Sequence, residues 1–257
     1  MVCISLGGNT VDEVLEAAEQ ATAEGADIFE VRFDKLYVEP VEITVQNDDG
    51  VEESSIEHVS RPVEDVDVMA AIGMMKKAIN KPVLFTCRGK DEGGEFPSSE
   101  KNRLDILKQA IESGVSWIDL EMSIEDKALK NLTDLASENG TKVVLSHHDT
   151  ETTPDKDEII SRVEEHASEA EIVKVCFNTR NHDDALSLFE AAWELKDKTV
   201  SYTLMGMGIG GDWPRLHAPL LRQAMVYTTL ETAFNLTDRG MVNVNDLRIA
   251  WKMLGHA

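Results

Sequence analysis

The chain has 257 residues, with 48 aspartate and glutamate residues against 25 lysine and arginine residues, and a formal net charge of −23. Its 42% hydrophobic and 28% charged residues are typical of a globular protein and exclude a disordered one. We find no apolar run of membrane-spanning length and no secretory leader, so we expect a cytoplasmic protein without membrane contacts, and the acidic charge argues against nucleic acid as a partner.

Cofactor and metal sites of the common kinds are not indicated. The cysteines, Cys3, Cys87 and Cys176, are far apart and form no CxxC pair, which argues against a disulfide framework and a structural zinc site. Acidic runs are spread along the chain without a calcium-loop pattern, and we interpret them as a solvated surface, suited to a salty cytoplasm. We expect no metal in this protein.

Eight short apolar runs rich in valine and isoleucine recur about every 30 residues, and we predict that each is a strand. They are residues 2–6, 28–33, 83–87, 117–122, 142–146, 172–177, 199–205 and 225–230. Helix-period segments lie between most of them, at 11–24, 66–79, 100–113, 125–138, 156–167 and 183–195, with a last helix at 244–254. Eight such units predict a single (β/α)8 TIM barrel as one catalytic domain over residues 1–257. The weakest unit is the last connection, where 216–224 is a short and poorly defined helix.

Residues 37–61 form an insertion after the second strand. Residues 41–46 and 51–59 alternate in hydrophobicity around Asp49-Gly50, which predicts an inserted hairpin, and a disordered acidic loop is the alternative.

Polar side chains fall on one face of five successive predicted strands, toward their carboxyl ends. Residues of the same parity point to the same side of a strand, and the opposite parity here is mainly apolar. A buried charge costs several kcal/mol unless it is paired, so charges on the inner face of a barrel indicate a site. The residues are Glu30, Arg32 and Asp34; Thr86 and Arg88; Asp119 and Glu121; Ser146 and His148; and Lys174 and Cys176.

Lys174 stands out because it lies in mid-strand between Val173 and Val175. Burial beside other cations would favour a free amine, which is the state that forms a Schiff base with a carbonyl compound. Cys176 is an alternative nucleophile, although cysteine more often behaves as a small hydrophobic residue. Of the pair His147-His148, parity favours His148 for the inner face without deciding it.

The positive charge of the predicted site indicates the class of its ligand. Arg32, Arg88, Lys174 and Arg215 would converge on one barrel mouth in a protein short of basic residues. A local positive potential on an acidic background favours a small anionic substrate.

A glycine run from Gly206 to Gly211 matches G-x-G-x-x-G. A dinucleotide-binding turn would open a helix of a βαβ unit and have an acidic residue about 20 positions later. Here Asp212-Trp213-Pro214 follows directly, so we interpret the run as a flexible loop at the barrel mouth that approaches a ligand closely.

Together these segments resemble the type I 3-dehydroquinate dehydratases, lyases of the shikimate pathway. The motifs are E-x-R-x-D at 30–34; F-T-x-R at 85–88, continued by E-G-G at 92–94; I-D-L-E at 118–121; S-x-H-D at 146–149 with T-P at 153–154; and V-N-D-L-R at 244–248. Met205-Gly206 and Arg215 are similar to the family's M-x-x-x-G-x-x-S-R loop. Pro214, Arg222-Gln223 and Met241 depart from the family's serine, Gly-Ser and glutamine.

The resemblance implies a (β/α)8 enzyme that dehydrates 3-dehydroquinate to 3-dehydroshikimate without a cofactor, as a homodimer. It implies that Lys174 forms the imine, that His148 is the general acid and base, and that Glu92 orients His148. The binding positions that it implies are Glu30, Arg32 and Arg88 for the ring hydroxyls, Arg215 for the carboxylate, and Ser5 and Thr237.

Two other functions stay open at this point. A class I aldolase-like barrel shares the Schiff-base lysine, but not the S-x-H-D and V-N-D-L-R motifs. A ligand-binding relative without activity is the other alternative.

Overall fold

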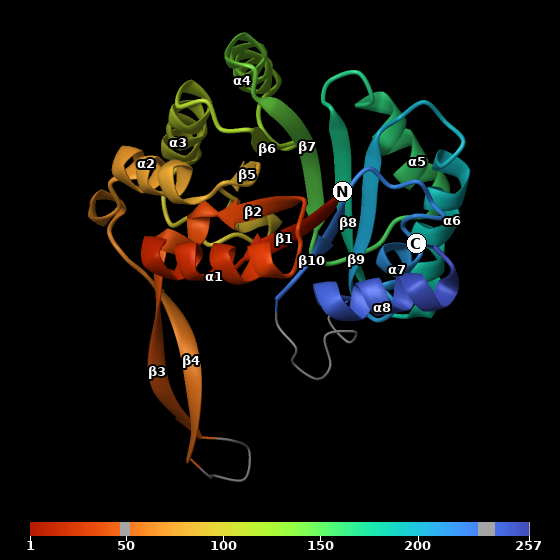
Figure 1. Ribbon diagram of the computed structural model, residues 1–257, viewed down its shortest axis with the longest axis horizontal. Coiled ribbons are helices and arrows are strands. Elements are labelled where there is room, and N and C mark those ends of the chain that lie inside the picture. Colours follow the sequence, from red (N-terminus) through yellow and green to blue (C-terminus); the bar gives the residue numbers. More distant parts are fainter. Residues whose placement is uncertain (47–51, 231–239, 257) are drawn as a thin grey trace.

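The computed structural model of the chain describes residues 1–46, 52–230 and 240–256, and its centre is one sheet of eight parallel strands (Figure 1). The sheet order is β10-β1-β2-β5-β6-β7-β8-β9. The strands are β1 (Val2–Leu6), β2 (Ile28–Arg32), β5 (Val83–Thr86), β6 (Trp117–Glu121), β7 (Lys142–Asp149), β8 (Ile172–Thr179), β9 (Tyr202–Gly208) and β10 (Val226–Thr228).

The sheet curves into a nearly closed barrel. Next to β10, the Ala224 N–H donates to the Tyr202 carbonyl at 2.9 Å, and the Leu204 N–H donates to the Gln223 side chain at 2.8 Å. These two bonds join β9 to the segment that leads into β10. The (β/α)8 barrel predicted from the sequence is therefore confirmed.

Helices follow most strands and surround the barrel (Figure 1). They are α1 (Val11–Ala23), α2 (Val68–Ala78), α3 (Glu100–Glu112), α4 (Asp126–Asn139), α5 (Lys156–Glu165), α6 (His182–Leu195), α7 (Trp213–Leu216) and α8 (Val244–Leu254), with 3-10 turns η1 (Phe33–Tyr37), η2 (Val63–Asp65) and η3 (Lys90–Glu92). Most α-helices begin at a side chain that accepts a backbone N–H, as Asn243 accepts from Asp246 at the start of α8. No helix in the described ranges is long and apolar enough to cross a bilayer.

The prediction of a helix at 216–224 was wrong. The short α7 begins at Trp213 and ends at Leu216, and the following residues form turns. Pro219 disfavours a helical Ala218, and Arg222 takes a positive φ of 53°, so the chain cannot continue as a helix here.

The insertion after β2 is a hairpin, as one of the two alternatives predicted. β3 (Val38–Gln46) pairs antiparallel with β4 (Glu52–Ser60), so that Val38 lies opposite Ser60 and Gln46 opposite Glu52. The hairpin extends away from the barrel (Figure 1), and its Asp49-Gly50 turn lies outside the described residues.

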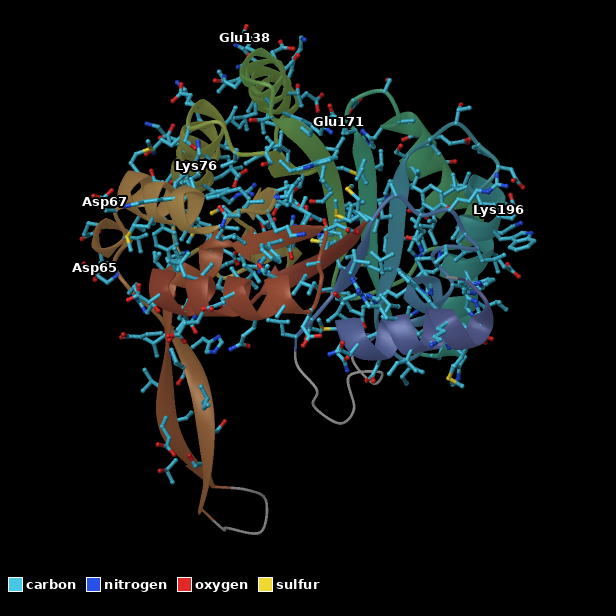
Figure 2. The ribbon with its side chains drawn as sticks, viewed as in Figure 1. Asp65, Asp67, Lys76, Glu138, Glu171 and Lys196 are labelled. Atoms are coloured by element: carbon cyan, nitrogen blue, oxygen red, sulfur yellow. The ribbon has the colours of Figure 1, made fainter. Side chains whose placement is uncertain are left out.

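The lumen has an apolar floor beneath a charged layer. The floor is a cluster that includes Cys3, Ile28, Trp117 and Val144. Residues two positions further along these strands, such as Glu30 and Asp119, share the same face and are buried above it. Asp65, Asp67 and Glu138 lie on the outside of the molecule (Figure 2). The buried charges of the lumen, such as Glu30 and Asp119, are therefore distinct from the charged surface.

Candidate active site

Lys174 lies in the lumen on β8 and is 3% exposed. Its Nζ is 3.6 Å from Glu30 Oε1, 3.6 Å from Asp119 Oδ2 and 4.1 Å from the ring centroid of Tyr227. The sequence predicted other cations around this amine, but its charged neighbours within 4.0 Å in the described chain are carboxylates. A cationic nitrogen at this position is therefore stabilised by two negative charges and by the face of an aromatic ring.

Both carboxylates are held ionised in spite of their burial. Burial by itself would raise the pKa of Glu30, but Lys174 and Arg32 outweigh it and lower that pKa below its usual value. Glu30 also accepts hydrogen bonds from Ser5 on β1 and from Thr86 Oγ1, the latter at 3.1 Å. For Asp119, burial is outweighed by Arg88 and then Lys174, and its pKa is lowered as well.

Arg88 follows β5 and is the centre of a buried ion network. Its Nη2 donates to Asp119 Oδ2 at 2.9 Å, and its Nη1 donates to Glu121 Oε1 at 2.9 Å and to Ser146 Oγ at 2.8 Å. Burial opposes the charged form, but Asp119 and Glu121 outweigh it and raise the pKa of Arg88. Arg103 from α3 is the second cation on Glu121, 2.9 Å from Oε2. No sequence pattern indicated Arg103, which lies on a helix among ordinary surface charges.

His148 lies on the inner face of β7 and is paired with Glu92, which comes from the turn after β5. Glu92 Oε2 is 3.0 Å from His148 Nδ1 and accepts the His148 backbone N–H at 2.9 Å. Burial, followed by Arg88 and Lys174, holds the pKa of His148 well below its usual value. Burial and then Glu121 raise the pKa of Glu92 to about 7. The arrangement gives a neutral imidazole whose Nδ1 faces a carboxylate.

The two glycines of the E-G-G motif are required because the backbone packs closely at this turn. Gly93 has a φ of +77°, which disfavours a side chain, and a Cβ on Gly94 would lie 2.1 Å from the Arg88 carbonyl oxygen. The two glycines fold the turn tightly onto Arg88. That fold directs Glu92 back toward His148.

His147 and Cys176, the alternatives to His148 and Lys174, lie in other settings. His147 points outward, with its Nε2 2.6 Å from Arg162 Nη1 on α5 and its ring against Phe177. Cys176 faces the lumen, where burial raises the pKa of its thiol above the usual value. A protonated thiol is a poor nucleophile.

Arg32 at the end of β2 and Arg215 on α7 are the other two arginines expected at the site. Arg32 makes a bidentate pair with Asp34, with Nε to Oδ1 at 2.9 Å and Nη2 to Oδ2 at 2.7 Å. Arg215 is 5% exposed, and none of the described carboxylates lies within 4.0 Å of its side chain. Burial lowers the pKa of Arg215, whose side chain bonds to backbone carbonyls and not to a close carboxylate. Arg215 is therefore the site cation most in need of an anion.

Arg215 also organises the glycine loop. Its Nη1 donates to the carbonyls of Gly206 at 2.9 Å and Gly211 at 2.8 Å, and also to that of Gly240. A Cβ on Gly206 would lie 2.5 Å from the Gly211 Cα, so the glycines allow the backbone to close on itself. Thr237, predicted to bind substrate near this loop, lies outside the described residues.

Known proteins match this chain along nearly its whole length. The family model described as type I 3-dehydroquinase matches residues 2–257. A 3-dehydroquinate dehydratase from Klebsiella pneumoniae subsp. pneumoniae is 31% identical over 238 residues, covering 91% of this chain and 86% of that protein.

The chain belongs to the type I 3-dehydroquinase family.

The family resemblance and the enzyme class inferred from the motifs are thereby confirmed. A 3-dehydroquinate dehydratase from Escherichia coli O17:K52:H18 is also similar, at 32% identity over 195 residues, which cover 74% of this chain and 76% of that protein. A crystal structure of the type I enzyme from Clostridium difficile has a TM-score of 0.81 at 23% identity, covering 99% of this chain and 91% of that chain. A 3-hexulose-6-phosphate synthase has a TM-score of 0.54 at 14% identity, so the barrel alone does not select the 3-dehydroquinase activity.

Two departures from the type I 3-dehydroquinase pattern contact each other. The side-chain amide of Gln223 donates to the Pro214 carbonyl at 2.9 Å and accepts the Leu204 N–H at 2.8 Å. Pro214 and Gln223 therefore form one local arrangement between β9 and β10.

Besides Arg103, two residues of the site were not predicted from the sequence. Tyr227 faces Lys174 from β10, and within the described chain its buried hydroxyl has no hydrogen-bond partner. Ser123 donates to Glu92 Oε1 at 2.7 Å. Parity along the last strand was the available signal for Tyr227, whereas no sequence pattern indicated Ser123.

Across the described ranges, no three histidine, cysteine or carboxylate side chains are placed to hold a metal ion together.

Proposed function

We propose that this family member dehydrates 3-dehydroquinate to 3-dehydroshikimate through an imine on Lys174, with His148 as general base and then general acid. The observation that carries the proposal is the buried amine of Lys174 between Glu30 and Asp119, on the strand next to that of His148. Because a protonated imine keeps the positive charge on nitrogen, both carboxylates stabilise it as they stabilise the ammonium group.

The proposed reaction begins and ends with the free side chain of Lys174. The ammonium form of Lys174 gives up a proton and the free amine adds to the ketone carbon. The hydroxyl group so formed takes up that proton and leaves as water, which gives the protonated imine. His148 removes a proton from the adjacent carbon, and the electron pair moves toward the imine nitrogen. The enamine expels the hydroxyl group, which takes that proton from His148 and leaves as water. Hydrolysis of the imine then releases the conjugated enone and restores the amine.

The binding roles of Glu30, Arg32 and Ser5 are those that the family resemblance implies, and the role of Arg215 is also supported by its charge. Arg215 takes the substrate carboxylate, because it is buried without a close carboxylate in the described chain. Glu30 and Arg32 hold ring hydroxyls, and Ser5 supports Glu30. Arg88 already binds Asp119, Glu121 and Ser146, so we assign its contribution mainly to holding these groups in place. Thr237 stays a predicted substrate contact.

The imine is tested by trapping it. Borohydride added to enzyme and 3-dehydroquinate should increase the intact mass by one reduced adduct, which peptide mapping should place on Lys174. An adduct on another lysine, or none, would contradict the proposal. Because an aldolase-like enzyme would also be trapped, enone absorbance formed from 3-dehydroquinate is measured in parallel, and its absence would favour that alternative.

The pH dependence should report Glu92. Its ionised carboxylate accepts the His148 Nδ1–H and leaves Nε2 free to take a proton, so kcat/KM should fall as the pH drops through the Glu92 pKa, about 7. The pKa of His148 is held lower by burial, Arg88 and Lys174, so the imidazole stays neutral across this range. The measurement is kcat/KM from about pH 5 to about pH 9.

Glu92→Gln is the matched control for this pH profile, because the amide is nearly isosteric but cannot ionise. This variant should be slower at every pH and should lose the acid limb. An acid limb that survives in Glu92→Gln would assign it to another group.

Two expectations accompany the activity. We propose one catalytic domain over residues 1–257, supported by the family match to residues 2–257. The homodimer and the cytoplasmic location stay predictions, and light scattering of the purified protein would test the dimer.

A further inference from the structure

Ser123 lies just after β6, two residues beyond Glu121, and its side chain is directed at the Glu92–His148 pair. Its hydroxyl donates to Glu92 Oε1 at 2.7 Å. The other oxygen of the same carboxylate, Oε2, accepts the backbone N–H of His148 at 2.9 Å and faces Nδ1 at 3.0 Å. Both oxygens of Glu92 are therefore held, and by different elements of the barrel.

We propose that Ser123 is a positioning residue that acts through Glu92: its hydroxyl fixes the carboxylate so that His148 keeps its proton on Nδ1 and leaves Nε2 free toward the substrate. This inference rests on the proposed function. Ser123 itself does not touch the reacting atoms in this scheme. It determines the orientation and the charge of the group that orients the base.

The other charged groups around Glu92 cannot replace this hydrogen bond. Arg88 Nη1 is 3.9 Å from Glu92 Oε2 and is already bonded to Glu121 and Ser146. Glu121 and Asp119 from β6 both raise the pKa of Glu92, and His148 from β7 contacts Oε2 rather than Oε1. Without the Ser123 hydroxyl, Oε1 would lose the one side-chain donor that it has in the described chain.

These effects on Glu92 predict the direction in which its pKa changes when the Ser123 hydroxyl is removed. Burial and Glu121 raise the pKa of Glu92 to about 7, and the hydrogen bond from Ser123 opposes them. Removing the hydroxyl should raise this pKa further, by about one unit, because a hydrogen bond to a charged group favours the charged form. At pH about 7 the ionised fraction of Glu92 would then fall from about one half to about one tenth.

The surroundings of Ser123 make it suitable for substitution. It lines a surface groove of about 400 Å³ together with His147, Ser161 and Arg162. This groove is on the outer side of β7, where His147 points, whereas Lys174 is in the lumen. A change at Ser123 therefore has space on the groove side.

The test compares pH profiles of kcat/KM for the wild-type enzyme, three variants at Ser123 and one control variant at Ser161. Ser123→Ala should shift the acid limb upward by about one unit, lower kcat/KM about fivefold at pH about 7, and recover near wild-type activity at higher pH. The near-isosteric pair Ser123→Thr and Ser123→Val repeats the comparison without a cavity, and only the valine variant should shift the limb. Ser161→Ala, which removes an exposed hydroxyl from the same groove, should change nothing.

A second measurement does not need turnover. In ¹⁵N-histidine NMR spectra of the free enzyme near neutral pH, assigned with His148→Gln, wild type and Ser123→Thr should show more of the Nδ1–H form of His148 than Ser123→Ala and Ser123→Val. An unmoved acid limb with an unchanged tautomer population would overturn the proposal, and so would an equal loss of activity at every pH. If wild type forms no borohydride adduct on Lys174, the proposed function fails, while the tautomer comparison still decides the role of Ser123.

Discussion

Lys174→Arg should leave a folded protein with no measurable turnover. The guanidinium group keeps a positive charge between Glu30 and Asp119, but it stays protonated and does not form an imine with a ketone. The loss of kcat should exceed the roughly 10⁴-fold upper range of a general acid–base contribution, because the covalent route disappears entirely. Enone formation from 3-dehydroquinate and borohydride trapping are the two measurements.

Lys174→Ala completes this experiment. It should be equally inactive, but it should also unfold at lower denaturant concentration, because Glu30 and Asp119 lose a shared cation. A non-catalytic binding protein would instead keep most of its affinity for 3-dehydroquinate in both variants. Normal turnover in Lys174→Arg would refute the imine mechanism.

Arg88→Ala should lower the free energy of unfolding by about 3–5 kcal/mol, the cost of removing one partner from a buried ion pair. Asp119 and Glu121 would both lose a hydrogen-bonded cation 2.9 Å away while remaining in the lumen. Asp119 has a lowered pKa in the folded state, so its contribution is present above the aspartate pKa of the unfolded chain and is lost as the pH falls through the folded value. Urea unfolding at neutral pH measures the loss.

Lys130→Ala is the matched control for Arg88→Ala, since Lys130 pairs with Asp134 at 3.0 Å on the exposed face of α4. An exposed pair of this kind contributes about 0.5 kcal/mol or less. In the Arg88→Ala background, Asp119→Asn should recover part of the lost stability by removing a buried charge that has lost its hydrogen-bonded cation and keeps only Lys174 at 3.6 Å. Equal effects of Arg88→Ala and Lys130→Ala would show that the network does not stabilise the fold.

The sequence predicted those parts of the fold that depend on local signals. The helix at 244–254 matches α8 because Asn243 caps its start and Gly255, with a φ of 68°, ends it. The segment at 216–224 lacked such signals, and Pro219 prevents a helix there. Apolar runs located the strands, but β7 continues to Asp149 because inward-facing His148 still pairs with β8.

The sequence also located the charged face of the barrel but not the partners within it. Parity placed Lys174 and Asp119 on inner faces, yet the expected cationic surroundings of Lys174 depended on counting arginines near strand ends. The structure brings carboxylates of β2 and β6 to the amine instead, and such lateral contacts depend on strand register and barrel closure. Arg215 likewise binds carbonyls of a loop, which no residue pattern encodes.

The charged residues of this barrel share ion-pair partners, which limits the substitutions that the sequence of this enzyme can accept one at a time. Glu121 serves both Arg88 and Arg103, and Asp119 serves both Arg88 and Lys174. Substitutions at groups that share a partner do not combine additively. The order in which changes accumulate therefore matters: replacing Glu121 alone removes a carboxylate from Arg88 and Arg103 at the same time, whereas a concerted exchange of these residues avoids this loss. We expect natural or laboratory lineages to alter these positions in linked sets and to explore single replacements mainly outside them.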